Sequence, residues 1–157
     1  KFWKLKSITV KKATLNDKDD VFIWRNDQQA IEMSLSNDSV SRSEHSSWFD
    51  KKIKSDKTLI LIGYCQNQKI GMTRFDLNKN ENIISINLDP ISRGKGLSSL
   101  FLKESIEYFI RSQETTHSYI KAKIKANNIP SIKSFTRAGF IKEKEFDDHL
   151  IYSLKLI

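Results

Sequence analysis

The sequence predicts one α/β domain over residues 1–157, built on a mixed sheet flanked by helices. Short runs rich in β-branched residues alternate with longer stretches in which apolar residues recur at helical spacing. Polar turns separate these segments, and no internal repeat, low-complexity tract or linker interrupts them. A chain of 157 residues is also long enough to bury a core without disulfides.

The first 55 residues predict one strand and two helices. Alternation at Ile8 and Val10 predicts a strand that begins near Ser7. Helix-capping residues (Thr14, Asn16, Asp17) precede a helical pattern that contains Val21, Phe22, Trp24 and Arg25. Residues 34–43 have no hydrophobic period and predict a long loop. Ser41 and Glu44 have the spacing of a capping box, so the second helix is expected to begin near Ser43.

The middle of the chain predicts three consecutive strands. Residues 59–64 form an apolar run, and residues 70–75 follow as its antiparallel partner after a turn at Asn67. Residues 78–82 make a polar turn, and residues 83–88 then predict a buried strand.

A turn between that strand and the next helix has the chemistry of an anion site. Apolar residues at helical spacing follow the turn (Leu97, Leu100, Phe101, Ile106, Phe109, Ile110). The first N–H groups of a helix lack internal partners, and the helix dipole is positive there. Gly94 and Gly96 permit close approach of a ligand, and Arg93 and Lys95 add positive charge. The stretch therefore predicts a phosphate-binding turn.

The last third predicts a strand, a helix and two strands. Ile120, Ala122 and Ile124 alternate with lysines, as in a half-exposed strand. Pro130 suits the first turn of a helix and Gly139 its end. Residues 140–145 and 150–156 predict the final strands, the latter with its leucines and Tyr152 on one face. The element order is β, α, α, β, β, β, α, β, α, β, β.

Composition is that of an ordinary globular protein, with 38% hydrophobic and 29% charged residues. The net charge of +8 is spread along the chain and accompanies no nucleic-acid recognition motif, so neither nucleic acid nor a membrane is expected as a partner. No signal-peptide pattern opens the chain. The single cysteine, Cys65, is expected to be a buried thiol, which suits a cytoplasmic location. A homodimer stays open, and no metal site is expected.

The turn fits neither of the common nucleotide motifs. The Walker spacing is absent, and Ser99 stands where the dinucleotide fingerprint requires a third glycine. Arg93, Gly96 and Ser98 instead resemble the Arg/Gln-x-x-Gly-x-Gly/Ala pyrophosphate turn of the GNAT superfamily of N-acetyltransferases. Ser98 replaces the usual small apolar residue, and its hydroxyl is expected to be tolerated and able to add a phosphate contact.

A second motif downstream strengthens the resemblance. Asn128, Ser131, Phe135, Gly139 and Phe140 are similar to the family pattern Asn-x-x-Ala-x-x-x-Tyr-x-x-x-Gly-Phe, with serine and phenylalanine as departures. The resemblance implies the GNAT fold, with a mostly antiparallel central sheet, and acetyl-CoA as co-substrate without a metal. The residues that it implies for cofactor binding are Ile86, Asn87, Leu88, Arg93, Gly94, Lys95, Gly96, Leu97, Ser98, Ser99, Asn128, Ser131 and Phe135. For Asn128 and Ser131 a helix cap and a packing face are the alternative.

The implied chemistry is direct attack of an amine on the thioester. Backbone N–H groups of residues 86–88, where the family splays its central strand, are the expected carbonyl contacts. Phe135 has no proton donor where many relatives have tyrosine, so no general acid is assigned. His45 is a candidate base, acting directly or through water, with a partly exposed helix position or a substrate hydrogen bond as its alternative.

The acceptor is expected to bind the N-terminal half of the chain. The Trp24-Arg25-Asn26 and Glu44-His45-x-x-Trp48-Phe49 elements resemble those of N-acetyltransferases that act on nucleotide-linked amino sugars, including the pseudaminic-acid-pathway enzyme. Similar elements occur in ribosomal-protein N-terminal acetyltransferases, so a protein amine stays an alternative, as does a CoA-binding domain without turnover. The expected acceptor-binding residues are Trp24, Arg25, Asn26, His45, Trp48 and Arg74. Core packing explains Trp24 and Trp48 equally well.

Overall fold

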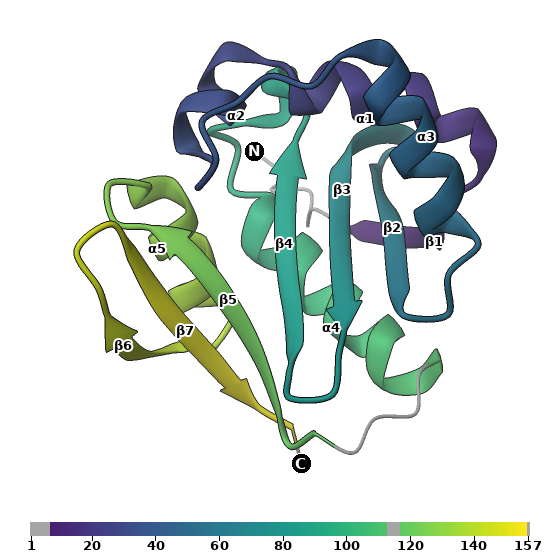
Figure 1. The fold of residues 1–157 in the computed structure, drawn as a ribbon. Helices are drawn as coiled ribbons and strands as arrows, with labels where there is room; N and C mark the ends of the chain where they lie inside the picture. The colour runs from purple at the N-terminus through teal and green to yellow at the C-terminus, as the bar shows by residue number, and fades with distance from the viewer. Residues whose placement is uncertain (1–6, 113–116, 157) are drawn as a thin grey trace, which may run out of the picture.

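The computed structural model describes residues 7–112 and 117–156. A seven-stranded sheet runs through the domain in the order β1-β2-β3-β4-β5-β7-β6, with helices on both faces (Figure 1). Neighbouring strands are antiparallel except β4 and β5, which are parallel. The predicted mixed, mostly antiparallel sheet is therefore confirmed.

The predicted element order is confirmed, with one additional short helix. The strands are β1 (Ile8–Lys12), β2 (Thr58–Cys65), β3 (Gln68–Leu77), β4 (Asn82–Leu88), β5 (Tyr119–Lys125), β6 (Ile141–Glu145) and β7 (His149–Lys155). The α-helices are α1 (Lys18–Arg25), α2 (Gln28–Met33), α3 (Arg42–Ile53), α4 (Ser98–Ser112) and α5 (Ile129–Arg137). Short 3-10 turns cover Leu15–Asp17 and Pro90–Ser92.

The face of the sheet that α4 and α5 cover carries the larger core. Buried side chains from β2, β3, β4, β5 and β7 pack there against both helices. The Phe75 and Phe109 rings stack with their centroids 4.5 Å apart, which joins β3 to α4. The buried Thr73 hydroxyl donates to the Ser105 hydroxyl over 2.8 Å, so the polar pair between the same elements is satisfied.

The opposite face carries a second core beneath α1 and α3 (Figure 1). Its buried members are Ala13, Val21, Trp24, Phe49, Ile60, Ile62 and Met72. Lys69 on β3 pairs with Asp17 and Asp20 at 2.7 and 2.8 Å, and these carboxylates raise the pKa of its ammonium despite partial burial. Helix α1 is therefore fastened to the sheet by charge as well as by apolar contact.

The structure corrects several local predictions. Helix α2 was not predicted, because none of its residues is buried and it has no apolar stripe. The capping box of Ser41 and Glu44 forms as predicted, although α3 begins at Arg42. Asn82 lies buried in β4 rather than in a polar turn. Cys65 is half-buried rather than buried, since it ends strand β2.

Helix α4 has a narrower apolar face than the sequence predicted. Ile110 is 55% exposed, so it does not share the buried stripe of α4 on which it was placed. Within the described part of the chain, no helix has the length and apolar character that crossing a bilayer requires.

Candidate active site

Strands β4 and β5 separate and leave a gap in the middle of the sheet. They pair only through Asn82 with Ile120 and Ile83 with Lys121, and Figure 1 shows them diverging toward the carboxyl end of β4. Residues 84–88 keep their pairing with β3 on the other side. The backbone N–H groups that face β5 beyond this pairing are therefore left for a ligand.

The hydrogen-bond pattern identifies which backbone groups face the gap. The Asp89 N–H donates to the Ile70 carbonyl over 2.8 Å, so this pair lies in a hydrogen-bonded position of the antiparallel ladder. Alternation then directs the backbone groups of Asn87 toward β3, and those of Ile86 and Leu88 toward the gap. Of the three residues predicted to donate backbone N–H groups, two are placed to do so.

A glycine holds β3 close to this part of β4. A Cβ on Gly71 would lie 2.4 Å from the Asn87 carbonyl oxygen and 2.8 Å from the Leu88 Cα. Any side chain at this position would displace the end of β4 whose N–H groups face the gap.

The predicted phosphate turn follows β4 and has an open surface. Gly94 and Gly96 have φ of 73° and 72°, which side-chain-bearing residues rarely adopt. Their missing Cβ positions face space with no protein atom within 4 Å. At the start of α4 the Phe101 N–H donates to the Leu97 carbonyl over 2.9 Å, so the N–H groups before Phe101 precede the i→i−4 bonds of the helix. The turn therefore fits the diphosphate of a coenzyme.

Leu97 anchors this turn while its neighbours stay near the surface. Leu97 is buried with Ile8, Ile70 and Phe101. Lys95 is exposed and Ser99 is half-buried at the start of α4. The predicted cofactor residues of the turn are thus brought together at one end of the gap.

Arg93 differs from its predicted role of adding charge for the phosphate. Its Nη1 donates to Asp27 Oδ2 over 2.6 Å, and its Nη2 donates to the Leu88 carbonyl over 3.1 Å. Asp27 also caps α2 by accepting from the Ala30 N–H. The guanidinium therefore ties the end of β4 and the turn to the N-terminal half, and Asp27 neutralises its charge.

Ser98 also has an internal partner. Its hydroxyl contacts the Ser134 hydroxyl on α5, and the Ser134 hydroxyl donates to the Pro130 carbonyl over 2.9 Å. Ser98 is then the donor in the contact between the two serines. Its proton joins α4 to α5, so the hydroxyl as placed here is already engaged and does not point a free proton at a phosphate.

The second motif forms the start and the buried face of α5. Asn128 caps the helix by accepting from the Ser131 N–H over 3.2 Å, as the alternative interpretation proposed. Asn128 and Ser131 are half-buried, whereas Phe135 is 3% exposed and packs edge-on against Phe140. Phe135 thus belongs to the core and presents no ring to solvent.

On the sheet face that α1 and α3 cover, two arginines, Arg25 on α1 and Arg74 on β3, lie close to the Trp48 ring. The Arg25 guanidinium carbon lies 4.3 Å from the Trp48 ring centroid, and that of Arg74 lies 5.4 Å from it. Arg74 also donates to Asp76 over 2.9 Å. Two cations therefore share one indole, which cation–π attraction favours.

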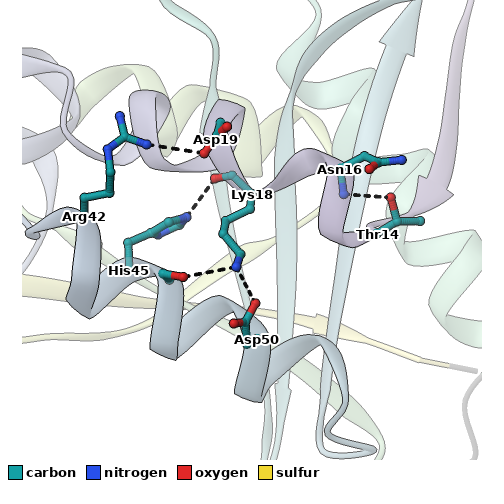
Figure 2. Close-up of polar contacts among 8 residues, drawn as sticks. Thr14, Asn16, Lys18, Asp19, Arg42, His45 and Asp50 are labelled. Atoms are coloured by element: carbon teal, nitrogen blue, oxygen red, sulfur yellow. Dashed lines mark hydrogen bonds and ion pairs between the residues drawn. The ribbon is translucent and has the colours of Figure 1, made fainter.

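His45 lies beneath this cluster with both ring nitrogens in use. It is 1% exposed, Arg25 Nη1 lies 3.1 Å from its Nδ1, and its Nε2 lies 2.9 Å from the Lys18 carbonyl. Figure 2 shows the Lys18 contact from α3 to α1. Since a guanidinium only donates and a carbonyl only accepts, the ring is neutral with its proton on Nε2. Burial lowers the pKa of His45, and Arg25 lowers it further, although the bond to Lys18 opposes them.

These contacts make His45 a support for Arg25. A general base needs a free lone pair within reach of the amine, and the Nδ1 lone pair of His45 accepts from Arg25. The Phe22, Trp48 and Phe49 rings surround the imidazole. The geometry therefore disfavours the predicted base, and the side chain is buried rather than partly exposed as the alternative interpretation expected.

Trp24 and Asn26 are also structural here. Trp24 is 4% exposed within the second core. The Asn26 side chain accepts from the Val40 N–H over 2.7 Å and donates to the Val40 carbonyl over 3.0 Å. It therefore fixes the end of the segment between α2 and α3.

That segment reaches across to β5. Lys125 Nζ donates to the Glu32 carbonyl over 2.7 Å and to Asn37 Oδ1 over 2.6 Å. Lys121, Lys123 and Lys125 lie on the same face of the sheet as Arg74, since the intervening residues of β5 are in the opposite core. Lys121 pairs with Glu143 and Lys123 with Glu81, so two of the three lysines on this face of β5 have a carboxylate partner.

Several residues of the site were not predicted from the sequence. Asp27 and Ser134 belong to the site because they contact Arg93 and Ser98, which lie far from them in the sequence. Of the two, only Asp27 has a local signal, that of an N-cap residue before α2. Among residues 7–112 and 117–156, no group of His, Cys, Asp and Glu side chains is arranged to hold a metal ion.

Comparison with known proteins assigns the family. The model of the acetyltransferase (GNAT) domain matches residues 7–141. The chain belongs to the GNAT acetyltransferase family and is an acetyl-CoA-dependent N-acetyltransferase. No curated protein sequence matches the chain.

Solved structures share the fold at low identity. A domain from Methanocaldococcus jannaschii DSM 2661 is 23% identical with a TM-score of 0.81, covering 96% of this chain and 99% of that one. Spermidine N-acetyltransferase from Vibrio cholerae, in complex with CoA and spermine, is 15% identical with a TM-score of 0.82, covering 94% and 95%. Aminoglycoside acetyltransferase AAC(6')-Ib, in complex with coenzyme A and kanamycin, is 15% identical with a TM-score of 0.80, covering 95% of each.

Proposed function

We propose that this enzyme acetylates the primary amine of an anionic small molecule, namely a nucleotide-linked amino sugar of the type used by the pseudaminic-acid-pathway enzyme. The observation that carries the proposal is the cluster of Arg25 and Arg74 on Trp48. It lies on the sheet face opposite α4, between α3 and strand β3.

Arg25 is a half-buried cation without an ion-pair partner among the described residues. Its contacts are the neutral His45 and the Trp48 ring. Burial lowers the pKa of the Arg25 guanidinium, and Arg74 lowers it further, while the more distant Glu44 opposes them. A guanidinium remains charged at neutral pH in spite of this. An anionic ligand would relieve both the repulsion between the arginines and the loss of hydration.

The same charges oppose a polycationic acceptor. Spermine and kanamycin, bound by the two relatives named above, carry several amino groups. In this chain such a ligand would meet Arg25, which has no carboxylate partner among the described residues, and Arg74, which is paired with Asp76. Like charges at close range disfavour binding, so the electrostatics select a phosphorylated amine over a polyamine.

In the proposed reaction the lone pair of a neutral amine forms a bond to the carbonyl carbon of acetyl-CoA, the C–S bond breaks, and CoA leaves as a thiolate. The proton that the nitrogen loses passes to that thiolate or to solvent. In the proposed arrangement, the glycine turn and the N-terminus of α4 bind the diphosphate of the coenzyme. The N–H groups of Ile86 and Leu88, directed into the gap, stabilise the oxyanion that develops. Asn128 and Ser131, at the start of α5, contact the pantetheine arm or the diphosphate of the coenzyme, and Phe135 on the same helix packs in the core. Arg25 and Arg74 orient the acceptor, and His45 positions Arg25.

An acceptor panel tests the proposal. Release of free CoA is measured with UDP-linked 4-amino sugars, spermidine and peptides with free N-termini. We expect turnover with the sugar nucleotides, and a KM for them at least tenfold higher in Arg25→Gln and Arg74→Gln. Arg111→Gln is the control, because Arg111 is an exposed cation on α4.

Three results would contradict the proposal. Faster turnover of peptides or of spermidine than of every sugar nucleotide would refute the acceptor class. Equal KM values for the sugar nucleotides in all three arginine variants would refute the role of the cluster. Absence of turnover with every amine, despite CoA binding, would favour a binding domain.

A further inference from the structure

A cavity of about 440 Å³ lies beside the arginine cluster, and most of the residues that line it have no role in the function proposed so far. It is formed by the end of α3, the start of β2 and the end of β3. The residues that line it are Trp48, Lys52, Ser55, Lys57, Thr58, Arg74, Asp76, Leu77 and Asn78. Trp48 and Arg74 belong both to this cavity and to the cluster, so the two are continuous.

The charges of the cavity wall are unbalanced. Three cationic side chains, Lys52, Lys57 and Arg74, face a single carboxylate, that of Asp76. Arg74 takes that carboxylate in a 2.9 Å ion pair. Among residues 7–112 and 117–156, neither lysine has a carboxylate within ion-pair distance of its ammonium. The wall therefore carries two uncompensated positive charges around a concave, polar space.

The position of the cavity suits the remote part of an acceptor. Arg74 and Asp76 pair across to Ser85 and Ile83 of β4. Ile86, whose N–H faces the gap, is three residues beyond Ile83, which is about 10 Å along a strand. A ligand that places an amine at the gap can thus extend its anionic part into the cavity.

Trp48 lines the cavity with two guanidiniums close to its ring. The indole therefore fixes the arginines at the mouth of the cavity. Recognition there is then through the charges of Arg74 and the two lysines.

We infer that this cavity binds the diphosphate of the acceptor, with Lys52 and Lys57 as its phosphate ligands and Arg74 at the junction with the amine-binding side. The inference rests on the proposed function, since it assigns the part of the same acceptor that carries the phosphates. A diphosphate diester has two negative charges, which match the two uncompensated lysines.

The test measures binding of UDP to the whole chain by calorimetry, with CoA present at saturation to occupy the glycine turn. The double variant Lys52→Gln/Lys57→Gln is compared with Lys51→Gln/Lys54→Gln. Lys51 and Lys54 are exposed, belong to the same end of α3 and do not line the cavity. Both double variants remove the same net charge, so a general electrostatic effect would act on both alike.

We expect the affinity for UDP to fall at least tenfold in Lys52→Gln/Lys57→Gln and to stay within twofold of wild type in the control. Uridine, which lacks phosphates, should bind too weakly to distinguish the proteins. Equal losses in both variants, or no loss in either, would overturn the assignment of the cavity.

Activity separates this inference from the proposed function. If wild type acetylates a UDP-linked amino sugar and Lys52→Gln/Lys57→Gln retains the wild-type KM, the cavity assignment fails and the proposed function stands. If wild type binds UDP through these lysines but acetylates no sugar nucleotide, the phosphate site stands and the proposed acceptor fails. A raised KM with an unchanged kcat supports both.

Discussion

Substitutions of Asp27 test whether the N-terminal half of the chain holds the predicted phosphate turn in place. The Asp27 carboxylate accepts from Arg93 over 2.6 Å and from the Ala30 N–H over 3.2 Å. Asp27→Asn keeps the helix cap, because asparagine caps about as well as aspartate, and removes the charge of the pair. Asp27→Ala removes both.

The magnitudes follow from burial. The two side chains are 21% and 24% exposed, so the pair should exceed the few tenths of a kcal/mol of a fully exposed ion pair. It should remain below the roughly 3 kcal/mol of a buried charged hydrogen bond. We expect Asp27→Asn to lower the free energy of unfolding by about 1 kcal/mol, and Asp27→Ala by about 2 kcal/mol, since a lost cap costs about 1 kcal/mol.

The pair also predicts a pH dependence. The hydrogen bond from Arg93 lowers the pKa of the Asp27 carboxyl. The folded protein therefore holds this proton less tightly than the unfolded chain, whose aspartate titrates at about 3.9. The stabilisation is complete above that pH and is lost as the pH falls through the lower, folded value. The difference between wild type and Asp27→Asn should shrink in acid.

Urea unfolding from pH 7 to the lowest pH at which the protein is folded measures these differences. Asp38→Asn is the control, because Asp38 is an exposed aspartate in the neighbouring segment between α2 and α3. The KM for acetyl-CoA should rise in Asp27→Asn and Asp27→Ala, since Arg93 holds the turn and the Leu88 carbonyl. The reasoning is refuted if Asp27→Asn and Asp38→Asn match in stability at every pH.

Three further substitutions examine the rest of the site. Gly96→Glu should abolish CoA binding in calorimetry, because it places a side chain and a negative charge in the open turn, at a residue whose φ is 72°. If the folded variant binds CoA with wild-type affinity, the turn is not part of the cofactor site. Phe135→Tyr should change kcat only modestly. It should lower the free energy of unfolding in urea by about 1–3 kcal/mol, since the added hydroxyl would lie in the core. A gain of about a hundredfold in kcat would show that protonation of the leaving thiolate was limiting. His45→Ala should raise the KM for an anionic acceptor and leave the pH profile of kcat unchanged, because it removes the imidazole that positions Arg25. A loss of about a hundredfold in kcat, with a shifted pH profile, would instead show that His45 acts as the base.

Local patterns predicted those features that depend on neighbours in the sequence. The capping box at Ser41 and Glu44 forms as expected, because both partners lie within one turn of helix. The hairpin turn at Asn67 has φ of 66°, a conformation that asparagine tolerates. The alternation at Ile120, Ala122 and Ile124 placed these residues correctly in the core.

The roles of polar side chains required the folded chain. The sequence indicated that Arg93 and Ser98 belong to the phosphate turn, but their partners, Asp27 and Ser134, are 66 and 36 residues away. His45 was a plausible base by residue type, and its burial and two hydrogen bonds come from α1. Helix α2 escaped detection because a helix without buried residues has no periodic apolar pattern.

The sequence by itself determined the family, a strand-turn-helix with the chemistry of an anion site, and the order of elements around it, since these depend on short-range spacing and local backbone preference. Only the tertiary structure decided which cations remain without carboxylates. Asp27 neutralises Arg93 beside the cofactor turn, whereas Arg25, Lys52 and Lys57 have no such partner in the described part of the chain. Charge balance depends on distances between segments far apart along the chain, and those distances are set by how the helices pack on the sheet.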